Sequence, residues 1–256
     1  MKIEFHYTYL LVAISFILTG YFSNLIIFTS IIIIHELGHY TIAKINKLNV
    51  EKIIIYPYGG LTKLNIPLNT NINKELSIAI SGVIFQCIYY IIIIIFYKYG
   101  LIRTYIFNQF TTYHHSILFF NLLPIHPLDG SKILTSLISK VFPYKITFKL
   151  NILISLITLT TLVVVNYYQF NYTTILILTL ILSSIHKYYK EINYFFNKFL
   201  LERYLHNITY PHTKKINKLD NIYKEKYHII RKNNHYITEK QALNQRFKGK
   251  YWILFD

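Results

Sequence analysis

The chain has 256 residues, of which 53% are hydrophobic, and its formal net charge is +16. The apolar residues come in runs of about 20, which favours transmembrane helices over a soluble core. A single cysteine, Cys87, excludes an internal disulfide and any site built from two cysteines. A basic excess beside apolar runs is typical of a cytoplasmic membrane face and anionic lipid, so direct binding of nucleic acid is not expected.

Two apolar helices open the predicted membrane region. The first spans Tyr7 to Phe22. It lacks a small-residue cleavage site, so we expect a retained helix and not a signal peptide. The second spans Leu25 to Ala43 and contains the sequence His35-Glu36-Leu37-Gly38-His39.

This HExxH motif is a candidate metal site. Residues four apart share one face of a helix, so His35 and His39 direct two imidazoles at one point, as zinc ligands do. Glu36 lies beside them, where it can take a proton from a water molecule at the metal. The alternative is a helix with two hydrogen-bonded histidines and a Glu36–Lys44 pair. A carboxylate at membrane depth is costly, which favours the functional interpretation.

The second helix is followed by a β-branched and aromatic stretch, Ile53 to Leu64, that surrounds a proline and the pair Gly59-Gly60. Such a stretch predicts a short membrane-associated β-hairpin. Beyond it, the apolar runs predict four further membrane helices and one amphipathic segment. The helices are Leu76–Tyr97, Phe107–Leu123, Ile152–Tyr167 and Thr173–Ile185, and the amphipathic segment is Ile133–Phe142.

A second motif follows the fourth helix. Two prolines and a glycine between Pro124 and Gly130 break the helix and predict irregular backbone around Asp129. A catalytic zinc takes three protein ligands, and Asp129 is the one deep acid besides Glu36 in the membrane part. We therefore predict that Asp129 joins the two histidines as a metal ligand and that Glu36 is the general base. Asn121 is predicted either to hydrogen-bond the substrate or developing oxyanion, or to cap the helix end.

The charges predict the domain organisation and the topology. Residues 187–256 hold 15 Lys and Arg and 6 Asp and Glu. We predict a transmembrane domain over residues 1–190 and a small basic cytoplasmic tail over 191–256. The predicted inner loops are rich in lysine, whereas the outer loops carry Lys98 and Arg103. The expected fold is an all-α polytopic membrane protein with about six transmembrane helices and both termini in the cytoplasm.

Taken together, these motifs resemble those of the site-2 proteases, a family of intramembrane zinc metalloproteases. The shared features are HELGH in a membrane helix, Pro57-Tyr58-Gly59-Gly60, a third helix centred on Gly82, and Asn121 followed by Pro127-Leu128-Asp129-Gly130. The resemblance covers roughly residues 5–205 and implies Zn²⁺ as the cofactor, held by His35, His39 and Asp129, with Glu36 as the catalytic residue. It also implies that the substrate binds as an extended strand along the hairpin edge. The residues expected to contact the substrate or transition state are Asn121, Gly59, Gly60 and Pro127.

Within this family the chain is most similar to the branch that acts in sporulation, through Ser116–Gly130 and Phe199–Tyr204. The resemblance implies the pro-sequence of a sigma factor as substrate, membrane-protein inhibitors as partners, and a location in the membrane around the forespore. It also implies a C-terminal CBS domain that contacts the substrate and senses ATP. The 52 residues after Tyr204 are short for that domain. The alternatives are a reduced CBS-like module around Tyr223–Ile237 that binds ATP, and a basic tail that binds substrate or lipid directly.

The sequence features also allow other interpretations. A peptidase of the prenyl-protein type would need Glu191 or Glu202 as its third ligand, and both lie in charged tail sequence. A site-2 protease could also act on another membrane-anchored regulator. From a different class, a non-catalytic membrane scaffold or a metal transporter would explain the apolar helices. A transporter is expected to repeat its motif in two halves, and the sequence has no internal repeat.

Overall fold

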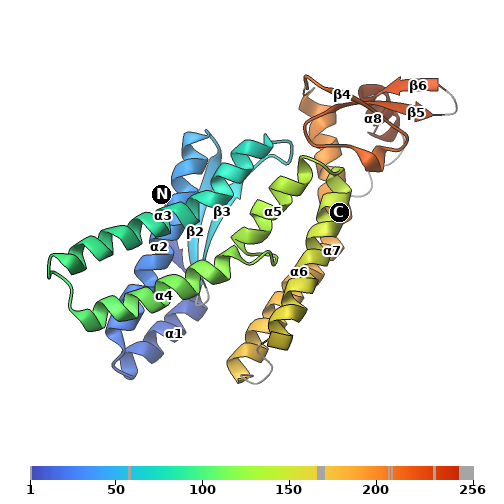
Figure 1. Ribbon diagram of the computed structural model, residues 1–256. Coiled ribbons are helices and arrows are strands. Elements are labelled where there is room, and N and C mark those ends of the chain that lie inside the picture. The colour runs from blue at the N-terminus through green and yellow to red at the C-terminus, as the bar shows by residue number, and fades with distance from the viewer. Residues whose placement is uncertain are drawn as a thin grey trace. The chain divides into compact units, whose positions relative to one another are not determined.

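The computed structural model describes the chain except for residues 1, 57–58, 166–170, 207, 209, 233–234 and 248–256. It divides the chain into two compact units, each formed by two segments (Figure 1). The first unit contains residues 1–66 and 76–123, and the second contains residues 67–75 and 124–256.

The first unit combines apolar helices with a small sheet. Its helices are α1 (Tyr7–Leu18), α2 (Phe22–Ile45), α4 (Thr104–Leu122) and most of α3 (Ile72–Lys98), and its strands are β1 (Ile3–Phe5), β2 (Asn49–Tyr56) and β3 (Gly59–Asn65). The helix that carries the HExxH motif is three residues longer at its N-terminus than predicted and two residues longer at its C-terminus.

The sheet has the strand order β1-β2-β3. Strand β2 pairs in parallel with β1 and antiparallel with β3, so that Ile53 lies opposite Thr62 and Ile55 opposite Gly60. The two residues between β2 and β3, which belong to the predicted turn, lie outside the described residues. The parallel strand β1 was not predicted, because three residues are too few to show an alternating pattern. Both β2 and β3 contact α2, which places the sheet beside the HExxH motif (Figure 1).

Helix α2 ends abruptly before the sheet. Lys47 has a φ of 58°, in the left-handed region, and the Leu48 amide donates a hydrogen bond to the carbonyl of Ala43 at 3.0 Å. This arrangement satisfies a carbonyl of the last turn and redirects the chain into β2. The end of the helix therefore fixes where the strands run relative to the motif.

Side chains from several elements hold α2 in the first unit. Ile32 of α2 packs with Tyr9 of α1 and Ile55 of β2 in one buried cluster. On another face of α2, Ile27 and Ile31 pack with Phe110 of α4. Because α2 is contacted on more than one face, its polar motif is also enclosed.

The second unit contains two long helices and a small C-terminal module. Its elements are α5 (Asp129–Ser139), α6 (Tyr144–Val165), α7 (Tyr172–His206), β4 (Thr213–Ile216), the 3₁₀ helix η2 (Leu219–Asn221), β5 (Tyr227–Lys232), β6 (His235–Thr238) and α8 (Glu239–Phe247). Helix α6 packs against both α5 and α7. Helix α7 continues through position 190, the predicted end of the membrane domain, as far as His206.

The predicted break in the helix is confirmed, because α4 ends at Leu122 and residues 123–128 are irregular, but the placement of Asp129 on this irregular backbone is wrong. Asp129 is the first residue of α5, directly after Leu128, whose backbone is extended. A helix accepts an acid in its first turn because the free amides there carry partial positive charge. The prolines at 124 and 127 precede this start and are compatible with a helix that begins after them.

The basic tail folds into a compact module. Strand β5 pairs in parallel with β4 and antiparallel with β6, and α8 packs on β5, β6 and α7. The buried cluster at its centre also includes Tyr144, the first residue of α6, whose ring stacks on Phe199 of α7 at 4.0 Å. The start of α6, the end of α7 and the module thus share one hydrophobic core.

Buried charges join the module to the end of α7. Arg203 is 4% exposed and its guanidinium donates to Glu239 Oε1 at 2.8 Å, while Glu239 Oε2 is 2.9 Å from Nδ1 of His228. Arg203 also donates to the backbone carbonyls of Tyr223 and Lys224. Removing one member of such a network leaves a buried partner uncompensated, which costs about 3–5 kcal/mol.

The network responds to acid. Burial alone would raise the pKa of Glu239, but the hydrogen bond with His228 and the Arg203 charge hold that pKa below its ordinary value. Burial lowers the pKa of His228, although Glu239 opposes the shift. The unfolded module therefore binds more protons than the folded one, so the module loses stability as the pH falls below about 6.5.

Three described helices are long and apolar enough to cross a membrane: α2, α3 and α6. Helix α1 is apolar but shorter. Apolar side chains on these helices are exposed, among them Ile26 at 68% and Ile91 at 55%. Exposed isoleucines at this density suit a lipid environment and not water.

We expect the Arg203→Met variant to loosen the module selectively. Loss of the guanidinium leaves Glu239 buried with half of its partners, so amide hydrogen exchange in β5 should accelerate by at least about a hundredfold. Lys240→Met, which removes an exposed charge from the same helix as Glu239, should leave exchange in β5 unchanged. Equal exchange in the two variants would show that the buried network does not hold the module.

Candidate metal centre

Helix α2 brings three buried polar side chains together at its centre. His35, Glu36 and His39 are 2%, 5% and 5% exposed. The Nε2 atoms of the two histidines lie 3.2 Å apart, and one ligand atom from each of the three residues lies within 4.8 Å of the others. The i, i+4 spacing therefore produces the convergence that the sequence predicts, and the group could hold a metal ion.

Hydrogen-bond acceptors on α3 bind the Nδ1 atoms of both histidines. Nδ1 of His35 is 3.0 Å from Oε1 of Gln86, and Nδ1 of His39 is 2.7 Å from the carbonyl oxygen of Ile78. Both oxygens can only accept, so each Nδ1 carries a proton, and in the neutral imidazole Nε2 then keeps its lone pair. This is the tautomer in which Nε2 binds a metal, with Nδ1–H directed at an outer acceptor.

Glycines keep α3 close to the site without filling it. A Cβ atom on Gly38 of α2 would lie 2.5 Å from the Ser81 carbonyl oxygen, so the two helices meet backbone to backbone. A Cβ atom on Gly82 would lie 2.6 Å from Nε2 of His35 and in contact with Nε2 of His39. Because Gly82 has no side chain, the space next to the Nε2 atoms of His35 and His39 stays open. Two neutral imidazoles that converge on a reserved space fit zinc.

Strand β3 positions Glu36. The hydroxyl of Thr62 donates to Oε2 of Glu36 at 2.6 Å. A Cβ atom on Gly60 would lie 2.6 Å from Oε1 of Glu36, so this position of the strand has no room for a side chain. Gly60, predicted as a substrate contact, therefore lies against the predicted general base, and Thr62 is a positioning residue that the sequence did not reveal.

Gln86 is the second residue that sequence reasoning missed. It is fully buried, and its amide Nε2 donates to the backbone carbonyl of His114 at 3.0 Å while Oε1 accepts from His35. The available signal was an amide side chain four residues after Gly82 in an otherwise apolar helix, which places both on one face. Gln86 thus links the site to α4 and fixes the orientation of one imidazole.

The other predicted site residues are Asp129, Asn121, Pro127 and Gly59, and each lies within one of the two units. Asp129 belongs to the second unit, where it is 5% exposed and its Oδ1 is 2.8 Å from Nζ of Lys132. Its role as a metal ligand therefore stays a prediction. Asn121 is half-buried near the end of α4, and Pro127 is exposed just before α5. Gly59 begins β3 with a φ of 151°, a conformation that residues with side chains rarely adopt.

Comparison with known proteins agrees with this geometry. The profile of peptidase family M50 matches residues 23–113. Stage IV sporulation protein FB of Bacillus subtilis is 30% identical over 206 residues, which cover 80% of this chain and 72% of that protein. The zinc metalloprotease MJ0392 of Methanocaldococcus jannaschii is 29% identical over 156 residues, covering 56% of this chain and 44% of that protein. Among solved structures, the site-2 protease from Methanocaldococcus jannaschii shares the fold, with a TM-score of 0.56 at 23% identity over 72% of this chain and 89% of that one.

Apolar helices around a buried histidine–glutamate–histidine group, together with these relatives, define a membrane metalloprotease that uses zinc. The chain belongs to peptidase family M50, the site-2 proteases. The predictions of the family, of the enzyme class and of the zinc cofactor are thereby confirmed.

We expect Gln86→Leu to weaken zinc binding by about 10- to 100-fold, because an imidazole that loses its outer acceptor is a poorer and less ordered ligand. Competition with a chromogenic chelator measures this affinity in the purified protein without any substrate. Gln86→Glu keeps an acceptor for His35 and should retain tighter binding than the leucine variant.

The matched control for this test is Gln109→Leu. Gln109 lies in α4 of the same unit and donates to Asn24 and Tyr105, away from the histidines. Its replacement should leave zinc affinity unchanged. Equal zinc affinity in Gln86→Leu and the wild type would remove Gln86 from the metal centre.

Proposed function

We propose that this metalloprotease hydrolyses a peptide bond in a membrane-associated protein, and that its substrate is the pro-sequence of a sporulation sigma factor. The observation that carries the substrate proposal is the 30% identity to a sporulation protein over 80% of the chain. The similarity includes the Ser116–Gly130 stretch that distinguished the sporulation branch in the sequence. The proposal extends the family assignment from a reaction class to one kind of substrate.

Each residue of the site has its own role in the proposed hydrolysis. His35 and His39 would hold zinc through Nε2, and zinc bound there would supply activation of water and polarisation of a carbonyl. Glu36 takes the proton from water and passes it to the leaving amine. Thr62 holds the Glu36 carboxylate by its hydrogen bond at 2.6 Å, so the base is oriented before the substrate arrives.

The third protein ligand in this proposal is Asp129. Its support is chemical: the acid is buried, and a buried carboxylate needs cationic or metal partners. Lys132, three residues further along α5, supplies one such partner at 2.8 Å. Asn121 and Pro127 are proposed to contact the substrate, together with Gly59 and Gly60 at the start of β3.

The proposed substrate strand adds to the sheet. In the order β1-β2-β3, strand β3 has a neighbour on one side only among the described strands. An extended peptide could pair with its other edge through main-chain hydrogen bonds. The same strand carries Gly60 and Thr62, both against Glu36, so a peptide on that edge would run beside the catalytic base.

The proposed setting is a multi-pass membrane protein of about six spans with both termini in the cytoplasm, in the membrane around the forespore. The lysine-rich loops support this topology. Residues 1–190 form the proposed membrane domain, and residues 191–256 form the cytoplasmic part. Proposed partners are membrane-protein inhibitors and, at the C-terminal module, ATP.

The substrate proposal is tested by co-expression with the host's candidate pro-sigma factor, followed by an immunoblot for the shortened product. We expect the product with the wild-type enzyme and not with Glu36→Gln, since loss of the base slows such reactions by about 10²–10⁴-fold. Glu36→Gln should still bind zinc, because the proposed ligands are intact. If the wild type leaves the sigma factor whole but cleaves another membrane-anchored regulator, the substrate proposal is wrong and the protease assignment stands.

The ligand proposal is tested by Asp129→Asn. We expect zinc affinity to fall by more than the 10- to 100-fold that loss of an outer hydrogen bond costs, because a ligand itself is removed. Chelator competition measures it, with Glu191→Gln and Glu202→Gln as controls in the same unit. If Asp129→Asn leaves zinc affinity unchanged and either control lowers it, Asp129 is not the third ligand, and the glutamate replaced in that control is.

A further inference from the structure

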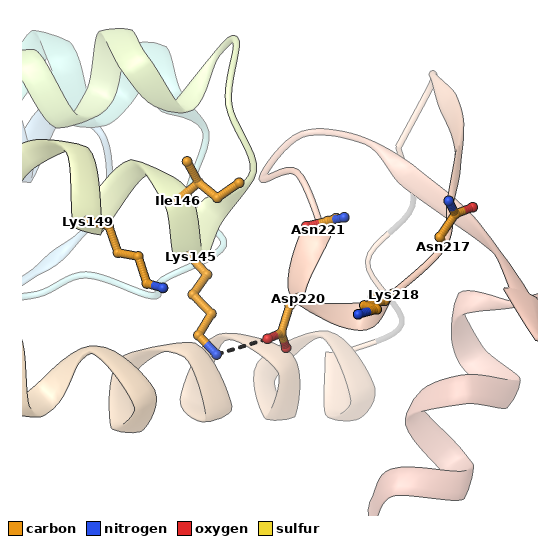
Figure 2. A pocket seen from close by; sticks show the side chains of 7 residues that line it. All are labelled: Lys145, Ile146, Lys149, Asn217, Lys218, Asp220 and Asn221. Carbon is orange, nitrogen blue, oxygen red and sulfur yellow. Dashed lines mark hydrogen bonds and ion pairs between the residues drawn. The ribbon is translucent and has the colours of Figure 1, made fainter.

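A polar cavity of about 460 Å³ lies in the second unit, where the first two turns of α6 face the segment around η2 (Figure 2). Lys145 and Lys149 extend into it from α6, and Lys218 and Asp220 border it from the module. The cavity is formed by residues that the proposed proteolysis does not use, so its purpose is a separate question.

The two walls of the cavity belong to one packed body. The Tyr144 amide donates to the carbonyl oxygen of Ile222 at 2.8 Å, which ties the start of α6 to the segment directly after η2. Both residues are also members of the buried cluster of the module. The distance between the lysines of α6 and the residues of the module is thus fixed by a core and not by a flexible linker.

The residues that line the cavity favour a negatively charged ligand. It contains three lysines and one acid, and the acid is engaged because Nζ of Lys145 is 3.0 Å from Oδ2 of Asp220. Among the described residues no acid pairs with Lys149 or Lys218. The side chains of Asn217 and Asn221 add amide donors to the same cavity. Ammonium and amide donors around one space match the oxygen atoms of a phosphate group.

The position along the chain indicates where that phosphate comes from. Helix α6 is one of the helices long and apolar enough to cross a membrane, and its bounds begin at Tyr144. Lys145 and Lys149 therefore lie where a span enters the headgroup layer, the depth at which lipid phosphates are found. Ile146, between them, is an exposed apolar residue at the cavity, as expected next to acyl chains.

We propose that this cavity binds the phosphate group of an anionic phospholipid headgroup, with Lys149 and Lys218 as its main cationic contacts. The inference depends on α6 crossing the membrane and not on the substrate of the protease. Asp220 competes with the lipid for Lys145, so the acid limits the affinity. A bound headgroup would join the module to the membrane surface at the start of α6.

The test is native mass spectrometry of the full-length protein in detergent, titrated with dioleoylphosphatidylglycerol and, separately, with dioleoylphosphatidylcholine. We expect phosphatidylglycerol to bind more tightly, and Lys149→Gln/Lys218→Gln to weaken it by about tenfold or more, since each lysine near a membrane surface adds a several-fold preference for anionic lipid. The control Lys187→Gln/Lys190→Gln removes two exposed lysines of α7 outside the cavity and should change the affinity little. Equal weakening in both double variants would overturn the proposal, because the attraction would then be general to the basic surface.

The Asp220→Asn variant should change the affinity for phosphatidylglycerol in the opposite direction. Removing the exposed acid frees Lys145, so phosphatidylglycerol should bind several-fold more tightly, which structural damage would not produce. Inorganic phosphate and ATP serve as competitors in the same titration. If either displaces the lipid from the wild type and loses its own binding in Lys149→Gln/Lys218→Gln, a soluble phosphate is the ligand and the lipid assignment is wrong. Zinc content measured in every variant should stay constant, which separates this test from those of the metal centre.

Discussion

The close approach of α2 and α3 is the constraint on which the metal centre depends. Imidazoles inside a membrane need acceptors for their N–H groups, because no bulk water is available there. Helix α3 supplies both acceptors, Gln86 for His35 and the Ile78 carbonyl for His39. It can do so only because Gly38 and Gly82 let the two backbones meet. Gly82 therefore has two effects: it permits the close approach of the helices, and it leaves space for the ion next to the two histidines.

This arrangement explains why the polar group is stable before any substrate binds. Glu36 is held by Thr62 from the sheet, and the two histidines are held from α3, so each of the three buried side chains has a partner outside α2. Buried polar groups with satisfied partners stay in one geometry, whereas unsatisfied ones are costly. The site is therefore organised by elements on two sides of the helix that carries its motif.

The sequence predicted those parts of the structure that repeat with a helical period or belong to a short motif. The convergence of His35 and His39 followed from their spacing alone, and the long apolar helices followed from composition. Thr62 and Gln86 could not be found in this way, because their importance depends on which strand and which helix face α2. The strand β1 and the fold of the C-terminal module were missed for a related reason, since both depend on pairing between distant segments with little periodicity of their own. Asp129 was placed on the irregular segment that contains the prolines, which covers residues 123–128, whereas it is the first residue of the helix that follows.

The shared core of Tyr144 and the module has a consequence for biosynthesis. Tyr144 leaves the ribosome before its contacts Phe199 and Ile222, which are made 55 and 78 positions later, and the shared core is complete only when Leu243 follows, 99 positions after Tyr144. At about 5–20 residues per second, the start of α6 waits on the order of 5–20 seconds for its cover. During that interval its aromatic surface is open to chaperones and to quality-control proteases. The abundance of this enzyme in the cell should then depend on how quickly the module from β4 to α8 is translated.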